Sequence, residues 1–141
     1  MTTGNRFPLI KKKRYIIKQF KKDGIAFKRE LKFYLFFNKK NLDFLPKLFA
    51  FSLSQRKLII ENVGINIKKD KLDVLQILNY EKILYKYGWY HNDIRLKNIL
   101  LNENKNKLYL IDFEQSENKF TDIARGYGDP NNYIYSLINQ K

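Results

Sequence analysis

Carboxylate and amide side chains recur at short intervals in the second half of the chain. Asp93 and Asn98 lie five positions apart, and Asp112 follows Asp93 by 19 residues. A carboxylate can orient a hydroxyl group and take its proton, and carboxylate and amide oxygens suit Mg²⁺. Arg95 and Lys97 add cations that could contact a phosphate. This segment therefore has the groups needed to hold a metal, a phosphate and an acceptor hydroxyl together.

The residues around this segment predict how it is positioned. Asn98 to Leu101 and Leu108 to Ile111 are apolar runs separated by a polar stretch, which predicts a short hairpin. The hairpin would return the chain so that Asp112 lies beside Asn98. Before it we expect a long helix over 72–87, with Asp73 near its start and Gly88 at its end, followed by a loop over 89–97.

The first half of the chain has a mixed pattern. It predicts a strand over 14–20, a helix over 25–37, and two strands over 47–54 and 56–63 that end at Gly64. In the helix, we expect one apolar face made of Phe27, Leu31, Tyr34 and Leu35. Beyond Glu114 the pattern is weaker and suggests a helix over 120–125, a turn over 126–130 and a last helix from residue 131.

The segment His91-Asn92-Asp93 to Asn98, followed by Ile111-Asp112-Phe113-Glu114, resembles the catalytic loop and metal-binding motif of the protein-kinase-like superfamily. The resemblance implies ATP and Mg²⁺ as cofactors. It implies that Asp93 is the base and that Asn98 and Asp112 are the metal ligands. Arg95 stands where many protein kinases place a lysine that touches the transferring phosphate, and Lys97 is a second cation nearby. His91 would support the loop rather than bind a metal.

The same resemblance assigns residues of the first half. Tyr15-Ile16-Ile17-Lys18 resembles the strand whose lysine holds the ATP phosphates, and Glu30, the acid of the next helix, would hold that lysine. Residues 58–64 resemble the hinge, where Glu61 and Val63 would offer backbone groups to adenine. Lys18 could instead be one more surface lysine, and Glu30 a solvated helix residue paired along the helix.

The sequence departs from the family pattern in several places. No glycine-rich loop precedes Lys18, although the basic run 11–14 could supply charge there, and Glu114 replaces the usual glycine after Asp112 and Phe113. The sequences H-N-D and I-D-F-E look like those of choline kinases and aminoglycoside phosphotransferases. Only 27 residues follow Glu114, a brevity similar to that of Rio kinases and the kinase of the KEOPS complex.

These features predict a fold class. We expect an α+β, minimal two-lobed protein-kinase-like fold in a single domain, 1–141. The N-lobe (1–63) would be a small antiparallel sheet with one helix, and the C-lobe (64–141) a truncated helical lobe. A length of 141 residues suits one domain with its own core.

Composition excludes several classes of site. The absence of cysteine excludes disulfides, thiolate metal sites and a cysteine nucleophile, and the single histidine excludes a histidine-rich metal site. The apolar stretches are too short to span a membrane, and no signal peptide is evident. We expect a cytoplasmic protein. The composition, rich in Lys, Asn and Ile, suggests a viral or AT-rich source, which would mean the host cytoplasm if the source is viral.

The net charge of +14 is unevenly distributed, with 18 Lys and Arg against five Asp and Glu in residues 1–70. Such asymmetry favours an anionic partner, although an AT-rich genome also enriches lysine. The leading functional prediction is an ATP- and Mg²⁺-dependent kinase, most simply an atypical serine/threonine protein kinase with a protein substrate. The alternatives are a small-molecule kinase and an inactive pseudokinase that binds nucleic acid or an acidic protein through the basic N-lobe.

Overall fold

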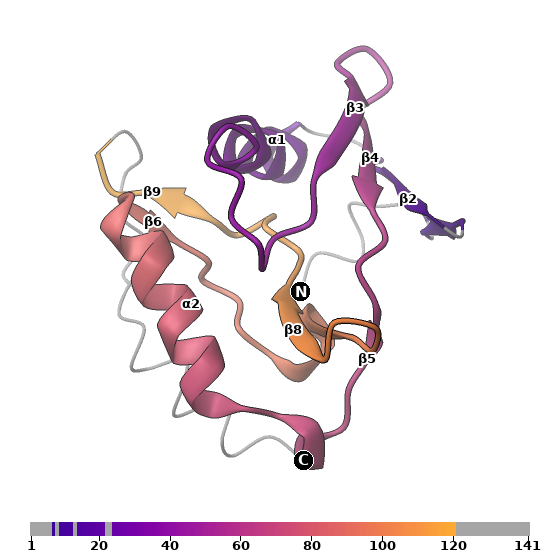
Figure 1. Cartoon of the computed structure of the whole chain (residues 1–141). Helices are drawn as coiled ribbons and strands as arrows, with labels where there is room; N and C mark the ends of the chain where they lie inside the picture. Colours follow the sequence, from indigo (N-terminus) through magenta and orange to yellow (C-terminus); the bar gives the residue numbers. More distant parts are fainter. Residues whose placement is uncertain (1–6, 8, 13, 22–23, 121–141) are drawn as a thin grey trace.

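The computed structural model describes residues 7, 9–12, 14–21 and 24–120. The helices and the turn expected after Phe120 lie outside these residues. The part described has two regions: α1 lies with the N-terminal sheet in the upper part of Figure 1, and α2, β5 and β8 form the lower part.

The N-terminal sheet is antiparallel and has four strands in the order β1-β2-β4-β3. Their bounds are Ile10–Lys11 (β1), Tyr15–Gln19 (β2), Leu48–Ser52 (β3) and Lys57–Glu61 (β4). β2 pairs with β4 along its whole length, with Ile16 opposite Ile60 and Lys18 opposite Leu58. Both strands are rich in β-branched residues, which suit a pleated surface. The expected strands of the first half are confirmed, and β1 is an addition.

Helix α1 covers Ile25–Phe37, as predicted. Its buried face is broader than expected, because Ala26, Phe27, Glu30, Leu31, Phe33, Tyr34 and Phe37 are all buried. Leu35 is 45% exposed, so its assignment to the core was wrong. At 100° per residue the buried face is centred on Glu30, Tyr34 and Phe37, and Leu35 falls beyond its edge.

The second half begins where Gly64 ends the hinge. A Cβ atom at Gly64 would lie 2.1 Å from the Leu101 carbonyl oxygen, so only glycine allows the chain to pass so close to the next strand. Ile65–Asn66 (β5) then pairs with β7, which the sequence did not reveal. Two-residue strands of this kind carry no periodicity that a sequence pattern could show.

The helix and hairpin of the second half match the prediction. After a short 3₁₀ helix (η2, Lys69–Lys71), α2 spans Val74–Lys86, and the Asp73 carboxylate caps it by accepting from the Gln76 N–H at 3.1 Å. The hairpin consists of Ile99–Asn102 (β7) and Lys107–Leu110 (β8), preceded by a 3₁₀ turn at Leu96–Asn98 (η3). The expected loop is not wholly irregular, because Trp89–Tyr90 (β6) pairs with Glu117–Asn118 (β9).

One hydrophobic cluster joins the two regions. Phe113 stacks on Phe33 of α1 with ring centroids 3.9 Å apart, and it meets Tyr34 edge-on. The segment after β8 is therefore packed against the helix of the N-terminal region. Within residues 7–120, as far as they are described, no helix is long and apolar enough to cross a membrane.

Candidate active site

The site brings together three charged side chains: Lys18, Glu30 and Asp112. Lys18 and Asp112 lie 94 positions apart in the sequence. The Lys18 ammonium forms an ion pair with Glu30 and lies 3.4 Å from Asp112 Oδ1. Glu30 is fully buried, and its second oxygen accepts from the Phe113 N–H at 2.9 Å. Burial raises the pKa of Glu30, and the nearby Lys18 charge opposes that rise. Neither residue is a solvated surface residue, so those alternatives were wrong.

His91 holds the loop around Asp93 in place. Its ring is 1% exposed; Nδ1 accepts from the Asp93 N–H at 3.1 Å, and Nε2 lies 2.8 Å from the Ile111 carbonyl oxygen. An accepting Nδ1 requires the proton on Nε2, which then donates to Ile111. Burial lowers the pKa of His91 and favours this neutral form. The histidine thus ties the Asp93 loop to the end of β8, next to Asp112.

Two side chains fix the orientation of the Asp93 carboxylate. Arg95 Nε lies 2.8 Å from Oδ1, and Arg95 Nη2 lies 3.1 Å from Oδ2. Asn98 Nδ2 donates to the Asp93 carbonyl oxygen at 2.9 Å and to Oδ2 at 3.1 Å. The structure therefore places Arg95 against Asp93, and its predicted contact with a transferring phosphate stays a prediction.

Backbone conformation at two positions also shapes the site. Asn92 and Asp112 have φ angles of 68° and 64°, in the left-handed region that Asn and Asp tolerate better than other side chains. The Asn92 amide donates to the Gln115 carbonyl oxygen at 3.1 Å and to Glu117 Oε1 at 2.7 Å. The asparagine of H-N-D therefore links the Asp93 loop to the segment after Asp112.

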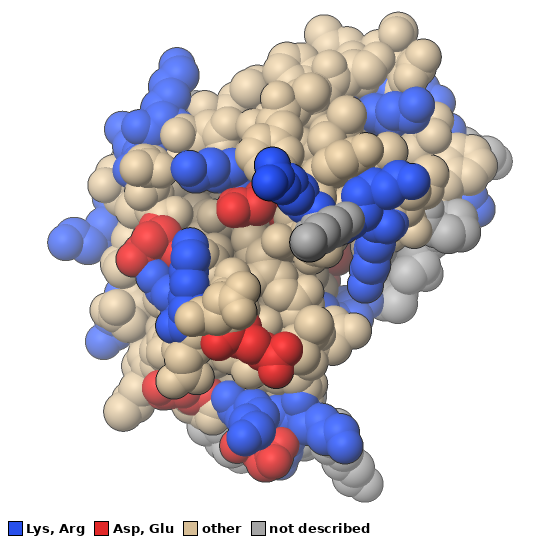
Figure 2. Space-filling view, turned by 45° about the vertical axis from the view of Figure 1, so that its right-hand side comes forward, with Lys and Arg blue, Asp and Glu red and all other residues tan. Residues whose placement is uncertain are grey.

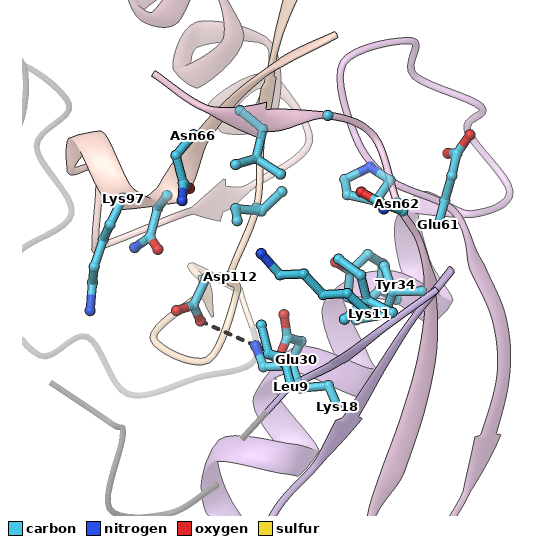
Figure 3. Close-up of a pocket in the computed structure, with 17 residues that line it drawn as sticks. Leu9, Lys11, Lys18, Glu30, Tyr34, Glu61, Asn62, Asn66, Lys97 and Asp112 are labelled. Carbon is cyan, nitrogen blue, oxygen red and sulfur yellow. Dashed lines mark hydrogen bonds and ion pairs between the residues drawn. The ribbon is translucent and has the colours of Figure 1, made fainter. Parts of the chain in front are cut away.

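A cavity of about 270 Å³ lies between the two regions (Figure 3). Lys97 and Asn66 lie toward one end of it, and Glu61 and Asn62 lie toward the other. Asn98 also lines it. Its remaining lining residues come from both regions: Leu9, Lys11, Ile16, Lys18, Glu30, Tyr34, Pro46, Ile60, Gly64, Leu100, Ile111 and Asp112. Of the predicted site residues, six line this cavity, whereas Asp93, Arg95 and Val63 do not.

The hinge residues differ in what their backbones can offer. The Glu61 N–H donates to the Lys47 carbonyl oxygen at 2.8 Å, so the sheet already uses it. Val63 packs its side chain against Leu100 and Tyr109. No hydrogen bond joins the Val63 N–H to any residue that the structure describes. The Val63 N–H is therefore not used within the described backbone, but Val63 does not line the cavity, so the predicted contact of either hinge residue with adenine stays a prediction.

The oxygen donors at the base of the cavity fit a hard cation. Asp112 contributes a carboxylate, and Asn98 contributes its amide oxygen, which receives no hydrogen bond from the described residues. Glu114 is fully buried, and its carboxylate lies with those of Glu30 and Asp112 in a group whose oxygens are within 4.8 Å of one another. Oxygen ligands of this kind are those preferred by Mg²⁺.

Several lining residues carry no sequence signal. Tyr34 and Asn66 line the cavity, yet neither belongs to a motif. Asn62 also lines it and lies in the segment that resembles the hinge, but no role was predicted for its side chain. Asn66 lines it because β5 pairs with β7, and that pairing could not be read from two residues. Tyr34 was expected only as a core residue of α1.

The comparisons with known proteins agree with this architecture. The model of the lipopolysaccharide kinase (Kdo/WaaP) family matches residues 61–126, which begin within the segment that resembles the hinge and include α2 and the Asp93–Asp112 segment. No curated protein matches the chain.

Solved structures match over more of the chain. The Cydia pomonella granulovirus kinase PK-1 superposes with a TM-score of 0.59 at 23% identity, over 77% of this chain and 47% of that one. Monomeric WbdD gives a TM-score of 0.64 at 19% identity, over 98% and 37%. The chain thus spans less than half the length of either structure. The predicted resemblance to the protein-kinase-like superfamily is confirmed, and the chain has a protein-kinase-like fold.

Proposed function

We propose that this chain is a phosphotransferase that uses ATP and Mg²⁺ to phosphorylate a hydroxyl group. One observation carries the proposal: Lys18, Glu30, Asn98 and Asp112, which come from four separate elements, converge on one cavity. A structural Lys18–Glu30 ion pair alone would not require a second carboxylate, that of Asp112, and the amide oxygen of Asn98 beside it. Strongly perturbed, buried charged groups in a cavity are typical of functional sites.

The cavity suits a nucleotide in its shape and chemistry. Ile16 and Ile60 line it from the N-terminal region, and Leu100 and Ile111 line it from the hairpin side. A flat apolar base fits between such side chains, with the Val63 N–H at the hinge as a donor. Lys18 would hold phosphate oxygens, while Asn98 and Asp112 would hold Mg²⁺.

Asp93 would orient the acceptor. When bound, ATP with its metal supplies the phosphoryl group and neutralises charge on it. Arg95 and Asn98 keep the Asp93 carboxylate in one orientation, and the His91 hydrogen bond fixes the backbone beneath it. A carboxylate held in this way can accept the proton of a hydroxyl group placed beside it. Arg95 would then act as a positioning residue, and Lys97 as the cation on the cavity.

Two classes of acceptor are supported by different observations. We put first a serine or threonine of a protein, as expected from the resemblance to atypical protein kinases. The second is a hydroxyl group of a sugar or another small molecule. The family match over residues 61–126 favours it, because that family is described as lipopolysaccharide kinases. The H-N-D and I-D-F-E sequences favour it as well.

The test is incubation with radiolabelled ATP and Mg²⁺, followed by detection of labelled protein, labelled small-molecule acceptors and released phosphate. We expect label transfer or hydrolysis in the wild type and a loss of about 100-fold or more in Asp93→Asn and Asp112→Asn. Asp70→Asn is the matched control, because Asp70 is exposed in η2 and outside the cavity.

The outcomes separate the alternatives. Turnover that survives in both site variants would refute the proposal. ATP binding without turnover would favour the pseudokinase. If ATP is not bound, the nucleotide assignment fails, and salt-dependent binding of nucleic acid would then be the next measurement. The surface charge bears on this nucleic-acid alternative. On the face in Figure 2, basic side chains are spread over the surface with acidic ones among them, and they are not gathered in one patch.

A further inference from the structure

Lys11 lies on the cavity from a strand that no motif identified. Strand β1 pairs with β2 so that Lys11 stands opposite Ile16, and Ile16 lies two residues from Lys18 on the same face of β2. Side chains of paired residues point to the same side of a sheet. Lys11 therefore faces the cavity, and Figure 3 shows its ammonium group directed into it.

The charge of Lys11 is not balanced in the way that the charge of Lys18 is. Lys18 contacts two carboxylates, those of Glu30 and Asp112. Over the described parts of the chain, the Lys11 ammonium has no ion-pair or hydrogen-bond partner. It is also exposed, so it keeps its solvation until a ligand arrives. An anion that enters the cavity on the side of β1 would therefore come close to the Lys11 ammonium group.

Residues 1–17 contain no glycine-rich phosphate-binding sequence. A glycine-rich loop binds phosphates through backbone N–H groups that glycine leaves accessible. Gly4 is the single glycine before Lys18, so no G-x-G-x-x-G sequence can form there. A polyphosphate bound in this cavity would therefore need another donor above it, and a side-chain ammonium can act as a point charge in that role.

We propose that Lys11 binds the phosphates of the nucleotide and takes the part that a glycine-rich loop plays in related folds. The inference rests on the proposed function, since it assumes that the cavity takes a nucleotide. Lys11 would act on the phosphates and not on the base. Its contribution should grow with the number of phosphates on the ligand.

Calorimetry tests the assignment of Lys11 to the phosphates. It measures the binding of adenosine, AMP, ADP and ATP to the full chain, each in the presence of Mg²⁺. A charge-assisted hydrogen bond contributes enough binding free energy that its loss is measurable. We therefore expect Lys11→Met to weaken ATP binding about tenfold or more. Adenosine binding should change by less than about twofold, since adenosine carries no phosphate. Lys11→Arg, which keeps the charge, should recover most of the ATP affinity.

Lys12→Met is the matched control. Lys12 is the next residue, carries the same charge and is exposed, but it does not line the cavity. It should leave ATP affinity within about twofold of the wild type. Thermal unfolding of each variant without ligand shows whether the fold is retained.

The possible results are distinguishable. If the wild type binds none of the four ligands, the proposed function fails. If the wild type binds ATP and Lys11→Met binds it equally well, the assignment of Lys11 is overturned while the proposed function stands. Equal losses for adenosine and ATP, or equal losses in the Lys11 and Lys12 variants, would also overturn it. Those results would show an effect on the base pocket or on overall charge.

Discussion

Replacing Lys18 with methionine should destabilise the protein, and the loss should depend on pH. Lys18 is 3% exposed and Glu30 is fully buried, so Lys18→Met leaves the Glu30 carboxylate in a dry environment without its counter-ion. Removing one partner of a buried pair typically costs about 3–5 kcal/mol. Against a total stability of about 5–15 kcal/mol for a domain, such a loss is large but measurable.

The sign of the pH dependence follows from the pKa of Glu30. Burial already raises this pKa above 4.5, and Lys18 holds it down. In Lys18→Met the folded-state pKa rises further. Between 4.5 and the folded-state value, the folded protein keeps a proton that the unfolded chain has released, so stability falls as pH rises. The cost should therefore be larger at about pH 8 than at about pH 5.

Urea unfolding without nucleotide or metal measures this at both pH values. The double variant Lys18→Met/Glu30→Gln removes the buried charge and keeps an acceptor for the Phe113 N–H, so it should recover most of the loss. Lys57→Met is the control: Lys57 lies on the opposite face of the sheet from Lys18, and its loss should cost less than about 0.5 kcal/mol. A Lys18→Met cost below about 1 kcal/mol at the higher pH, or an equal cost at both, would refute the reasoning.

Three further predictions concern the elements that hold the site. Gly64→Ala should cost about 1–3 kcal/mol in urea unfolding, because its Cβ would meet the Leu101 carbonyl at 2.1 Å. Gly24→Ala, where a Cβ meets only the flexible Lys28 side chain at 3.3 Å, should cost under about 1 kcal/mol, and the reverse order would contradict the close approach. Asp73→Ala should cost about 1 kcal/mol through loss of the α2 cap, and the reasoning fails if helix content and stability are unchanged. His91 is held neutral by a lowered pKa, so wild-type stability should fall as pH drops below 6.5, where the unfolded chain takes up a proton first. His91→Gln should flatten this slope, and an unchanged slope would assign it to other groups.

The sequence alone predicted the regular elements and the motif that they carry. α1 matches the expected range at both ends, because an apolar period of 3.6 runs unbroken between Asp23-Gly24 and Asn38. β2, β4, α2 and the β7–β8 hairpin follow in the same way from β-branched runs and from an N-cap at Asp73. The spacing of Asp93, Asn98 and Asp112, with the residues around them, was enough to indicate a protein-kinase-like fold.

The tertiary structure decided which side chains meet. The resemblance predicted that Glu30 holds Lys18, but no local signal showed that Asp112 joins the same ion-pair network. That contact depends on the packing of Phe113 against Phe33. The contact of Arg95 with Asp93 depends on the shape of one loop.

The role of Lys11 also depends on tertiary structure, because it follows from the pairing register of a two-residue strand. Local propensity determines where helices and strands begin and end, and it acts over a few neighbouring residues. Contacts between residues far apart in sequence are set by how the two halves pack on their common core. For this reason the sequence could specify the groups of the site but not their arrangement.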